Sequence, residues 1–378
     1  MEIKEFSSTT AKKQLMLLAD FGRQLTGETD FDKLLSVIAT QISKIIGVKR
    51  CFIFIKDDKN KEFWSKIARG KGLKHTEIHL PLNGDSIAAF VGRTGNTVNI
   101  QNANENTTFS RALDRITGFK TNSVLAIPLI NKEGNIIGVF QLSNKKNNKA
   151  FDGNDEGLLK LLASLAGTNI EIAALYNEVQ LANLETIYRL AITAEYRDQY
   201  DTKAHLQHIS EICHKLAKDL NFNDGDADII KNASMLHDIG KVAISDSILL
   251  KPGKLTEDEY NRMKMHAIYG GKILESAKSK ILKIAYKMSL YHHEKYDGSG
   301  YPFALSGVHI PIEARILSVA DVFDALCMHR VYKRPWSEQK AYEYIVDHSG
   351  SDFDPEVVQA FKRIFDDVKK MYYVKIKK

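Results

Sequence analysis

The sequence is poor in cysteine: its 378 residues include only Cys51, Cys213 and Cys327, which lie far apart. An odd number of cysteines at such spacing argues against a disulfide framework and against a zinc site built from cysteine thiolates. The scarcity is typical of a reducing compartment. Any metal ion must therefore be bound by His, Asp and Glu side chains.

Long apolar runs and strong charge bias are also missing. We find no stretch approaching the roughly 18 to 20 apolar residues of a membrane-spanning helix and no secretory signal at the start. The 53 basic and 47 acidic residues leave a net charge of +6, without the long basic stripe that would favour nucleic-acid binding. We therefore expect a cytoplasmic protein that binds neither a membrane nor a nucleic-acid polymer.

Hydrophobic periodicity divides the chain into two halves. Helical spacing in residues 13–47 is followed by alternating segments such as "RCFIFIKDD", "SVLAIPLI" and "NIIGVFQLSN", which predict short strands. A helix, a set of strands and a closing helix together predict an α+β sandwich. From residue 186 to about 375 alternating segments are almost absent, so the second half is predicted to be helical.

Between the halves, residues 156–185 have helical periodicity. Apolar side chains recur there at spacings of four, seven, three and four: Leu161, Leu165, Ile172, Leu175 and Val179. Such a stripe packs into a core or pairs with a second copy in a parallel dimer. We favour the dimer because this helix joins two domains and has little else nearby in sequence to pack against.

The second half contains a series of side chains that can bind metal ions. In chain order they are His205, His237, Asp238, His266, His292, His293 and Asp321. One His alone is more often a surface or satisfied core residue than a ligand. A series on separate helical segments can build a metal site from inward-facing side chains. We place His237 and Asp238 on such a helical segment, where adjacent residues point about 100° apart, so the carboxylate can bridge two ions.

Five segments carry a resemblance to a known family: "HDIGK" at 237–241, "ILLKPGKLTEDEY" at 248–260, "MKMHAIYG" at 263–270, "HHEKYDGSGYP" at 292–302 and "ARILSVADVFDAL" at 314–326. Residues 184–370 thereby resemble the HD superfamily of metal-dependent phosphohydrolases, and more narrowly its HD-GYP branch. The resemblance implies hydrolysis of the bacterial second messenger cyclic di-GMP to pGpG. A metal-bound hydroxide is expected to attack phosphorus in line, and a second cleavage to GMP stays open.

The resemblance also implies residue roles. It implies Asp238 as a bridging ligand that steers the proton, and the other members of the series as terminal ligands. Lys241 lies one helical turn beyond His237 and Asp238. Its ammonium group is assigned to a substrate phosphate or to the charge that develops at phosphorus. Tyr301, Arg330 and Lys333 are implied to hold the dinucleotide, since a guanidinium binds phosphate as a bidentate fork. The plainer readings, a tight turn at "DGSGYP" and a basic surface turn at "HRVYKRPWS", stay open.

Two positions depart from the family pattern. Family members often have Arg-Pro-Tyr where this chain has "RVY", which weakens the assignment of Arg330. Asp201 stands four residues before His205, where some members carry a longer glutamate linked to a third metal. The sequence therefore predicts a binuclear or trinuclear centre. Iron is implied by the resemblance, and manganese suits the same ligands.

Residues 13–180 resemble a GAF domain, a small α+β module that binds small molecules. The matching stretches are "GDSIAAFVGRTGNTVNIQNANENTTFSR", "TNSVLAIPLINKEGNIIGVFQLSNK" and "FDGNDEGLLKLLASLAG". A signature of cyclic-nucleotide-binding GAF domains is matched by Asn144, Lys145, Phe151, Asp155 and Glu156. For Lys145 and Asp155 we favour a structural ion pair between the last strand and the closing helix. The ligand of this domain is unknown.

Together these patterns predict a multidomain protein with an N-terminal α+β GAF sandwich at 13–170, a linker helix and possible dimer coiled coil at 171–188, and a C-terminal all-α HD-type helical bundle at 189–375. The predicted function is GAF-regulated, metal-dependent hydrolysis of cyclic di-GMP in a homodimer. The alternatives are a catalytically silent module that binds a cyclic dinucleotide, and an HD phosphohydrolase acting on another nucleotide.

Overall fold

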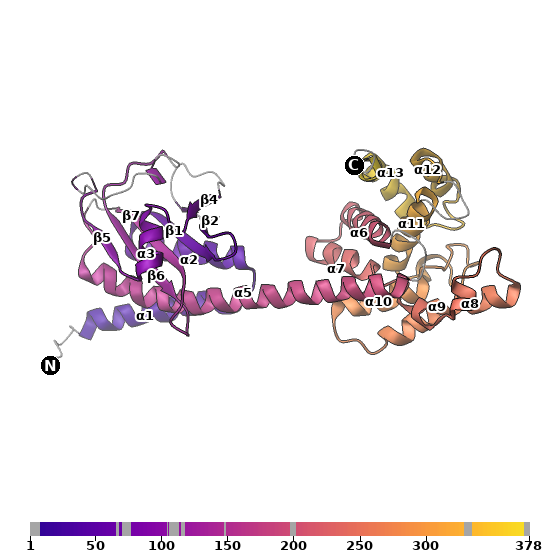
Figure 1. Ribbon diagram of the computed structural model, residues 1–378, viewed down its shortest axis with the longest axis horizontal. Helices are drawn as coiled ribbons and strands as arrows, with labels where there is room; N and C mark the ends of the chain where they lie inside the picture. Colours follow the sequence, from indigo (N-terminus) through magenta and orange to yellow (C-terminus); the bar gives the residue numbers. More distant parts are fainter. Residues whose placement is uncertain are drawn as a thin grey trace. The chain divides into compact units, whose positions relative to one another are not determined.

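A computed structural model describes residues 8–65, 68–69, 77–103, 105, 113–114, 118–146, 149–196, 202–328 and 335–373. The chain divides into two compact units, Met1–Leu181 and Ala182–Lys378 (Figure 1). The first unit combines a sheet with helices, and the described part of the second is helical, as the sequence predicts. The boundary between the units falls within the long helix α5 (Gly153–Glu195). The finer predicted domain limits stay predictions.

An antiparallel sheet forms the centre of the first unit, in the order β4-β2-β1-β7-β6-β5, with β3 pairing to β1 off this path. The strands are β1 (Val48–Asp57), β2 (Glu62–Ser65), β3 (Ala68–Arg69), β4 (Ile78–Pro81), β5 (Val98–Ile100), β6 (Val124–Ile130) and β7 (Ile136–Lys145). The helices are α1 (Ser8–Leu25), α2 (Phe31–Ile46), α3 (Ile87–Thr94) and the first part of α5.

Both faces of this sheet are covered because its central strands are apolar on both sides. In β1, Cys51 and Ile53 point into a core shared with α1, α2 and α5. Phe52 and Phe54 point to the other face, where they pack with α3, as the two-residue period of a strand requires. Lys145 Nζ lies 2.6 Å from Asp155 Oδ2. The predicted ion pair between the last strand and the closing helix is therefore confirmed.

Helix α5 is more apolar than the sequence analysis expected. By length and composition it is able to cross a membrane, since an 18-residue window has a mean hydropathy of 1.5; 39% of that window is buried. In the first unit, one side of α5 packs into the core through Leu159, Leu162, Ala166 and Ile170. Part of this apolar composition therefore serves the folded domain.

The second unit is built on one hydrophobic core. Its elements after α5 are α6 (Thr202–Asp219), α7 (Asp224–Ser234), η1 (Ile239–Ala243), α8 (Asp246–Leu249), α9 (Glu257–Leu274), α10 (Lys280–Tyr291), η2 (Gly307–His309), α11 (Ile312–Cys327), α12 (Glu338–Asp347) and α13 (Pro355–Tyr373). Local signals define several ends. At α9, for example, Thr256 and Glu259 form a reciprocal capping box.

Candidate metal centre

The histidines predicted as ligands come together in the second unit from four parts of the chain. His205 lies on α6 and His266 on α9, but the two adjacent pairs lie just after helices rather than on them. Helix α7 ends at Ser234, and His237 and Asp238 occupy the turn before the 3₁₀ helix η1. Our placement of this pair on a helix was wrong.

Gly240 allows the chain after this turn to pack closely against α9. A Cβ atom at this position would lie 2.0 Å from the backbone oxygen of His266 and 2.4 Å from the backbone nitrogen of Gly270. Only a glycine allows η1 to pack directly on α9. This close approach brings the His237–Asp238 turn against His266.

Two groups of three residues each hold their potential ligand atoms within 4.8 Å of one another. The first group is His266, His292 and His293, and the second is Glu195, His205 and His237. Glu195 is absent from the set predicted from sequence. It occupies a core-facing position at the end of α5, beside the buried Ala191 and Ala194. A carboxylate in such an apolar stripe is the signal that could have identified it.

Asp238 lies between the two groups. Its Oδ1 is 3.3 Å from Nε2 of His266, and its Oδ2 is 3.3 Å from Nε2 of His237. Lys241 Nζ lies 2.8 Å from the same Oδ2. The two carboxylate oxygens thus face different imidazole groups, which is the arrangement that a bridging carboxylate needs. Asp321 lies nearby, with Oδ1 4.0 Å from Nε2 of His237.

Backbone carbonyl groups orient three of the rings. Nδ1 of His237 contacts the oxygen of Ser234 at 2.9 Å, Nδ1 of His266 contacts that of Met263 at 2.7 Å, and Nδ1 of His292 contacts that of Met288 at 3.0 Å. A carbonyl oxygen only accepts hydrogen bonds, so each Nδ1 carries the proton. In the neutral form of such a ring the lone pair is on Nε2, which faces the centre, as metal ligation requires.

The residues fit a group of metal ions. Among the described residues, the buried atoms Glu195 Oε1, His237 Nε2 and Asp238 Oδ1 have no hydrogen-bond partner. Buried polar atoms without partners are rare in folded proteins. Glu195 and His237 belong to one group, and Asp238 Oδ1 lies beside His266 of the other, so metal ions bound by the two groups would satisfy these atoms.

The electrostatics of the centre divide its histidines. Burial opposes the charged form of His237, but Asp238 and Asp321 outweigh it and raise its pKa to about 10, so a metal ion would displace a proton from this ring. Burial lowers the pKa of His292 to about 4, which leaves its ring neutral.

Burial opposes the ionised form of Asp238, but Lys241 and His237 outweigh it and hold its pKa well below the usual value. Neutral imidazole and ionised carboxylate are the forms that bind metal. Burial also raises the pKa of Glu195, so its ionisation depends on positive charge nearby.

Asp324 orients His205, a member of the second group, by a contact to its Nδ1. Its carboxylate is fully buried, with Oδ2 2.7 Å from Nδ1 of His205 and Oδ1 2.8 Å from Nδ1 of His208. The Tyr372 hydroxyl donates to Oδ1 at 2.5 Å. Burial opposes ionisation of Asp324, but the hydrogen bonds from both histidines keep its pKa below the usual value. Sequence analysis named none of Asp324, His208 and Tyr372.

The "DGSGYP" loop places Tyr301 beside the first group. The Tyr301 ring stacks on His293, with centroids 4.6 Å apart and an interplanar angle of 27°. Buried Glu294 holds the loop, because its two carboxylate oxygens accept hydrogen bonds from the backbone nitrogens of Phe303 (2.7 Å) and Leu305 (3.0 Å). At Gly300 a Cβ atom would lie 2.3 Å from the nitrogen of Lys295, so the loop folds tightly onto its own start.

Comparison with known proteins identifies both units. A model of the HD domain matches residues 170–357, and a model of the GAF domain matches residues 30–170. The chain contains a GAF domain and an HD domain. These matches confirm the two domain types that the sequence motifs predict.

Three curated relatives match part of the chain. One relative is the cyclic di-GMP phosphodiesterase response regulator RpfG of Xanthomonas campestris pv. campestris, which is 46% identical over 192 residues. This match covers 51% of this chain and 50% of that protein. The chain is 41% identical over 213 residues to the 3'3'-cGAMP-specific phosphodiesterase 2 of Vibrio cholerae serotype O1, covering 56% and 41% respectively. A cyclic di-GMP phosphodiesterase of Thermotoga maritima is 37% identical over 217 residues, covering 57% and 58%. The chain spans about half the length of these relatives.

Three predicted site residues of the HD domain lie outside the described residues. They are Asp201, predicted at a third metal, and Arg330 and Lys333, predicted at the substrate phosphates. All the other predicted metal-binding and substrate-binding residues lie in or beside the centre. The roles assigned to them stay predictions.

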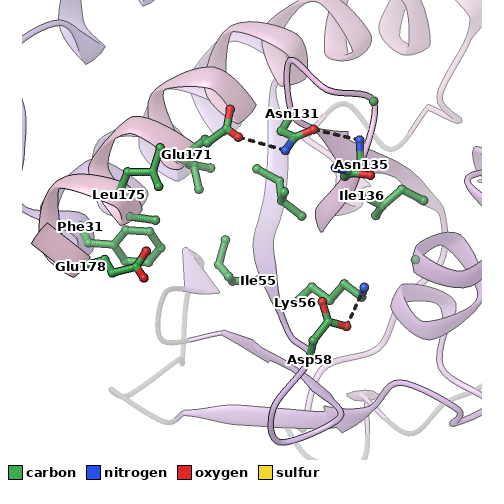
Figure 2. A pocket seen from close by; sticks show the side chains of 15 residues that line it. Phe31, Ile55, Lys56, Asp58, Asn131, Asn135, Ile136, Glu171, Leu175 and Glu178 are labelled. Carbon is green, nitrogen blue, oxygen red and sulfur yellow. Dashed lines mark hydrogen bonds and ion pairs between the residues drawn. The ribbon is translucent and has the colours of Figure 1, made fainter.

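The GAF domain contains a pocket of about 800 Å³ between α5, the start of α2, the end of β1 and the β6–β7 turn (Figure 2). Phe31, Ile55 and Leu175 supply apolar walls. On the polar side, Asn131 Nδ2 donates to Glu171 Oε1 at 3.0 Å, and Lys56 Nζ lies 2.7 Å from Asp58 Oδ1. A cavity of this size can hold a small organic molecule.

Proposed function

We propose that this protein is a metal-dependent phosphodiesterase that hydrolyses cyclic di-GMP. The observation that carries the proposal is the position of Asp238 between two groups of imidazoles, with Lys241 beside it. The relatives named as cyclic di-GMP phosphodiesterases support it. The proposed product is pGpG, and a second cleavage to GMP stays open.

The protein groups supply ligands, orientation and charge. His205, His237, His266, His292, His293 and Asp321 are proposed as terminal ligands and Asp238 as the bridge, with Glu195 added on the ground of its geometry. Two metal ions, when bound, supply electrophilic stabilisation of the phosphate and a nucleophile at neutral pH. We propose iron, with manganese as the second candidate, and a third ion if Asp201 contributes.

Lys241 and Tyr301 are proposed to act on the substrate. Lys241 is positioned by Asp238, so its ammonium can stabilise negative charge that develops at phosphorus. Tyr301 presents an aromatic ring next to His293, on which a guanine base can stack. Arg330 and Lys333 are proposed to bind the phosphates of the dinucleotide.

The experiment is to purify the protein anaerobically, quantify iron, manganese and zinc per chain, and follow cyclic di-GMP by chromatography. Two or three metal ions per chain with formation of pGpG support the proposal, and His292→Ala should abolish turnover. Full binding of cyclic di-GMP without product would assign the protein to the silent binding modules instead.

A second substrate has a specific observation in its favour. The Vibrio cholerae relative, named as specific for 3'3'-cGAMP, is 41% identical over 213 residues. The two dinucleotides differ in one base. Competition between them in one reaction, with products separated by chromatography, would decide which has the higher kcat/KM.

The GAF domain is proposed to regulate this activity by binding a small molecule, in a cytoplasmic homodimer. The pocket in Figure 2 supports the ligand part of the proposal. A ligand changes activity only through different affinities for two states of the protein. Insertion of four residues into α5 between the two domains should change the activity or its response to ligand, and an unaffected enzyme would reduce α5 to a passive linker.

A further inference from the structure

A positive charge lies close to two tyrosine rings beside the first group of imidazoles. Lys264 Nζ is 4.6 Å from the ring centroid of Tyr260 and 5.6 Å from that of Tyr301, both within the range of a cation–π contact. Tyr260 and Lys264 lie one turn apart on α9, and Tyr301 also stacks on His293. We call Tyr260, Lys264 and Tyr301 the aromatic rim, since they border the candidate metal centre.

The charge of Lys264 is available to a ligand. Among the described residues, its Nζ has one further polar partner, the neutral Oδ1 of Asn261 at 3.3 Å, and no carboxylate within ion-pair distance. Lys251, by contrast, lies 2.5 Å from Glu259 of the same helix α9. The Lys264 side chain is half-buried, and its ammonium retains donors for the acceptor atoms of a bound molecule.

The two rings of the aromatic rim offer flat surfaces next to this charge. Tyr260 is 49% exposed, so a ligand can reach its ring. Aromatic groups stack with their centroids about 4.5 to 7 Å apart, and Lys264 Nζ lies at a similar distance from each ring. A base stacked on Tyr260 or Tyr301 therefore has its polar edge within reach of the flexible lysine side chain.

The edges of the two purines differ in what they offer to an ammonium group. Guanine presents two acceptors, O6 and N7, whereas adenine presents N7 beside the donor group at N6. Because a lysine ammonium only donates hydrogen bonds, it pairs with both groups of guanine but opposes the amino group of adenine. A phosphate group would attract the same charge without regard to the base. Selectivity between bases is thus the property that separates the two roles.

We propose that Lys264 selects guanine over adenine and that Tyr260 supplies a stacking surface for the selected base. The inference rests on the proposed function in taking a cyclic dinucleotide as the ligand. A ligand with one guanine and one adenine would bind in one orientation, with its guanine at Lys264. Lys264 would then determine which of the two phosphodiester bonds of that ligand is hydrolysed.

The first test is calorimetric titration with phosphorothioate analogues of cyclic di-GMP and cyclic di-AMP, which resist hydrolysis. Lys264→Met keeps the apolar stem and removes the charge. It should raise the Kd of the guanine analogue about 10-fold and leave that of the adenine analogue unchanged. Lys272→Met, at an exposed position of the same helix, is the control and should leave both Kd values unchanged.

Two results of this titration would overturn the inference. An equal loss of affinity for both analogues in Lys264→Met would assign the lysine to phosphate, and equal binding of both analogues by wild type would show that no base is selected. The titration measures binding without turnover. Wild type that binds the guanine analogue selectively but leaves cyclic di-GMP intact would therefore contradict the phosphodiesterase proposal alone.

The second test uses 3'3'-cGAMP, whose hydrolysis gives either pGpA or pApG. Wild type should form one isomer in excess, and Lys264→Met should bring the two toward equal amounts, as measured by chromatography. Tyr260→Leu should lower kcat/KM about 10-fold without evening out the isomers, whereas Tyr260→Phe, which keeps the ring, should resemble wild type. Equal amounts from wild type, or the wild-type excess in Lys264→Met, would overturn the inference.

Discussion

Asp324 Oδ2 lies 2.7 Å from Nδ1 of His205, 119 residues away in the sequence. The contact fixes the His205 ring with Nε2 available to the centre. It also links α6 to α11. A ligand held in this way loses less freedom on binding metal.

Asp324→Asn should therefore weaken metal binding. We expect a loss of about 10- to 100-fold in affinity, the usual effect of removing a partner behind a ligating histidine, while His205 itself remains. Titration of the apoprotein with metal, monitored by calorimetry, measures this affinity. Tyr372→Phe removes only the third hydrogen bond to the same carboxylate and should have a smaller effect. Equal affinities in Asp324→Asn and wild type would contradict the role.

Glu195→Gln should lower the number of metal ions bound per chain by one. The substitution removes a carboxylate from the group with His205 and His237 and leaves the group of His266, His292 and His293 intact. Elemental analysis of purified protein gives the stoichiometry. Glu185→Gln, at an exposed position of the same helix, is the control and should retain the full content. Unchanged stoichiometry in Glu195→Gln would remove Glu195 from the ligand set.

Gly240→Ala should destabilise the HD domain. The added methyl group would meet backbone atoms of α9 at 2.0 and 2.4 Å, which cannot move aside as a flexible side chain can. We expect a cost of about 2 kcal/mol and a decrease in Tm of roughly 4 to 8 °C, measured by calorimetry. Gly225→Ala, whose nearest neighbour would lie 3.5 Å away, should not lower the Tm. Equal melting of the two variants would show that η1 has room to shift.

Glu294→Gln should affect substrate binding more than chemistry. The carboxylate holds the backbone of the Tyr301 loop through two hydrogen bonds, and an amide can accept only one of them with its oxygen. We expect KM for cyclic di-GMP to rise several-fold while kcat and metal content change little. Steady-state kinetics separate these effects. A fall in kcat with constant KM would instead place Glu294 in the reaction itself.

The sequence predicted the residue types of the centre better than its geometry. Motifs on separate segments identified the histidines, since a series of such residues is rarely accidental. They could not show that His237 and Asp238 sit in a turn, which depends on the contact of Gly240 with α9. Periodicity found the exposed stripe on α5 but not Glu195, a single carboxylate at the end of that helix. The pairing of Asp324 with His205 joins distant segments, and no local pattern encodes it.

The most direct test of the central claim is the fate of cyclic di-GMP with anaerobically purified, metal-replete protein, followed by chromatography. We predict conversion to pGpG, and its loss both in His292→Ala and after treatment with a chelator. Cyclic di-GMP that remains intact with two or three metal ions bound per chain would contradict the account.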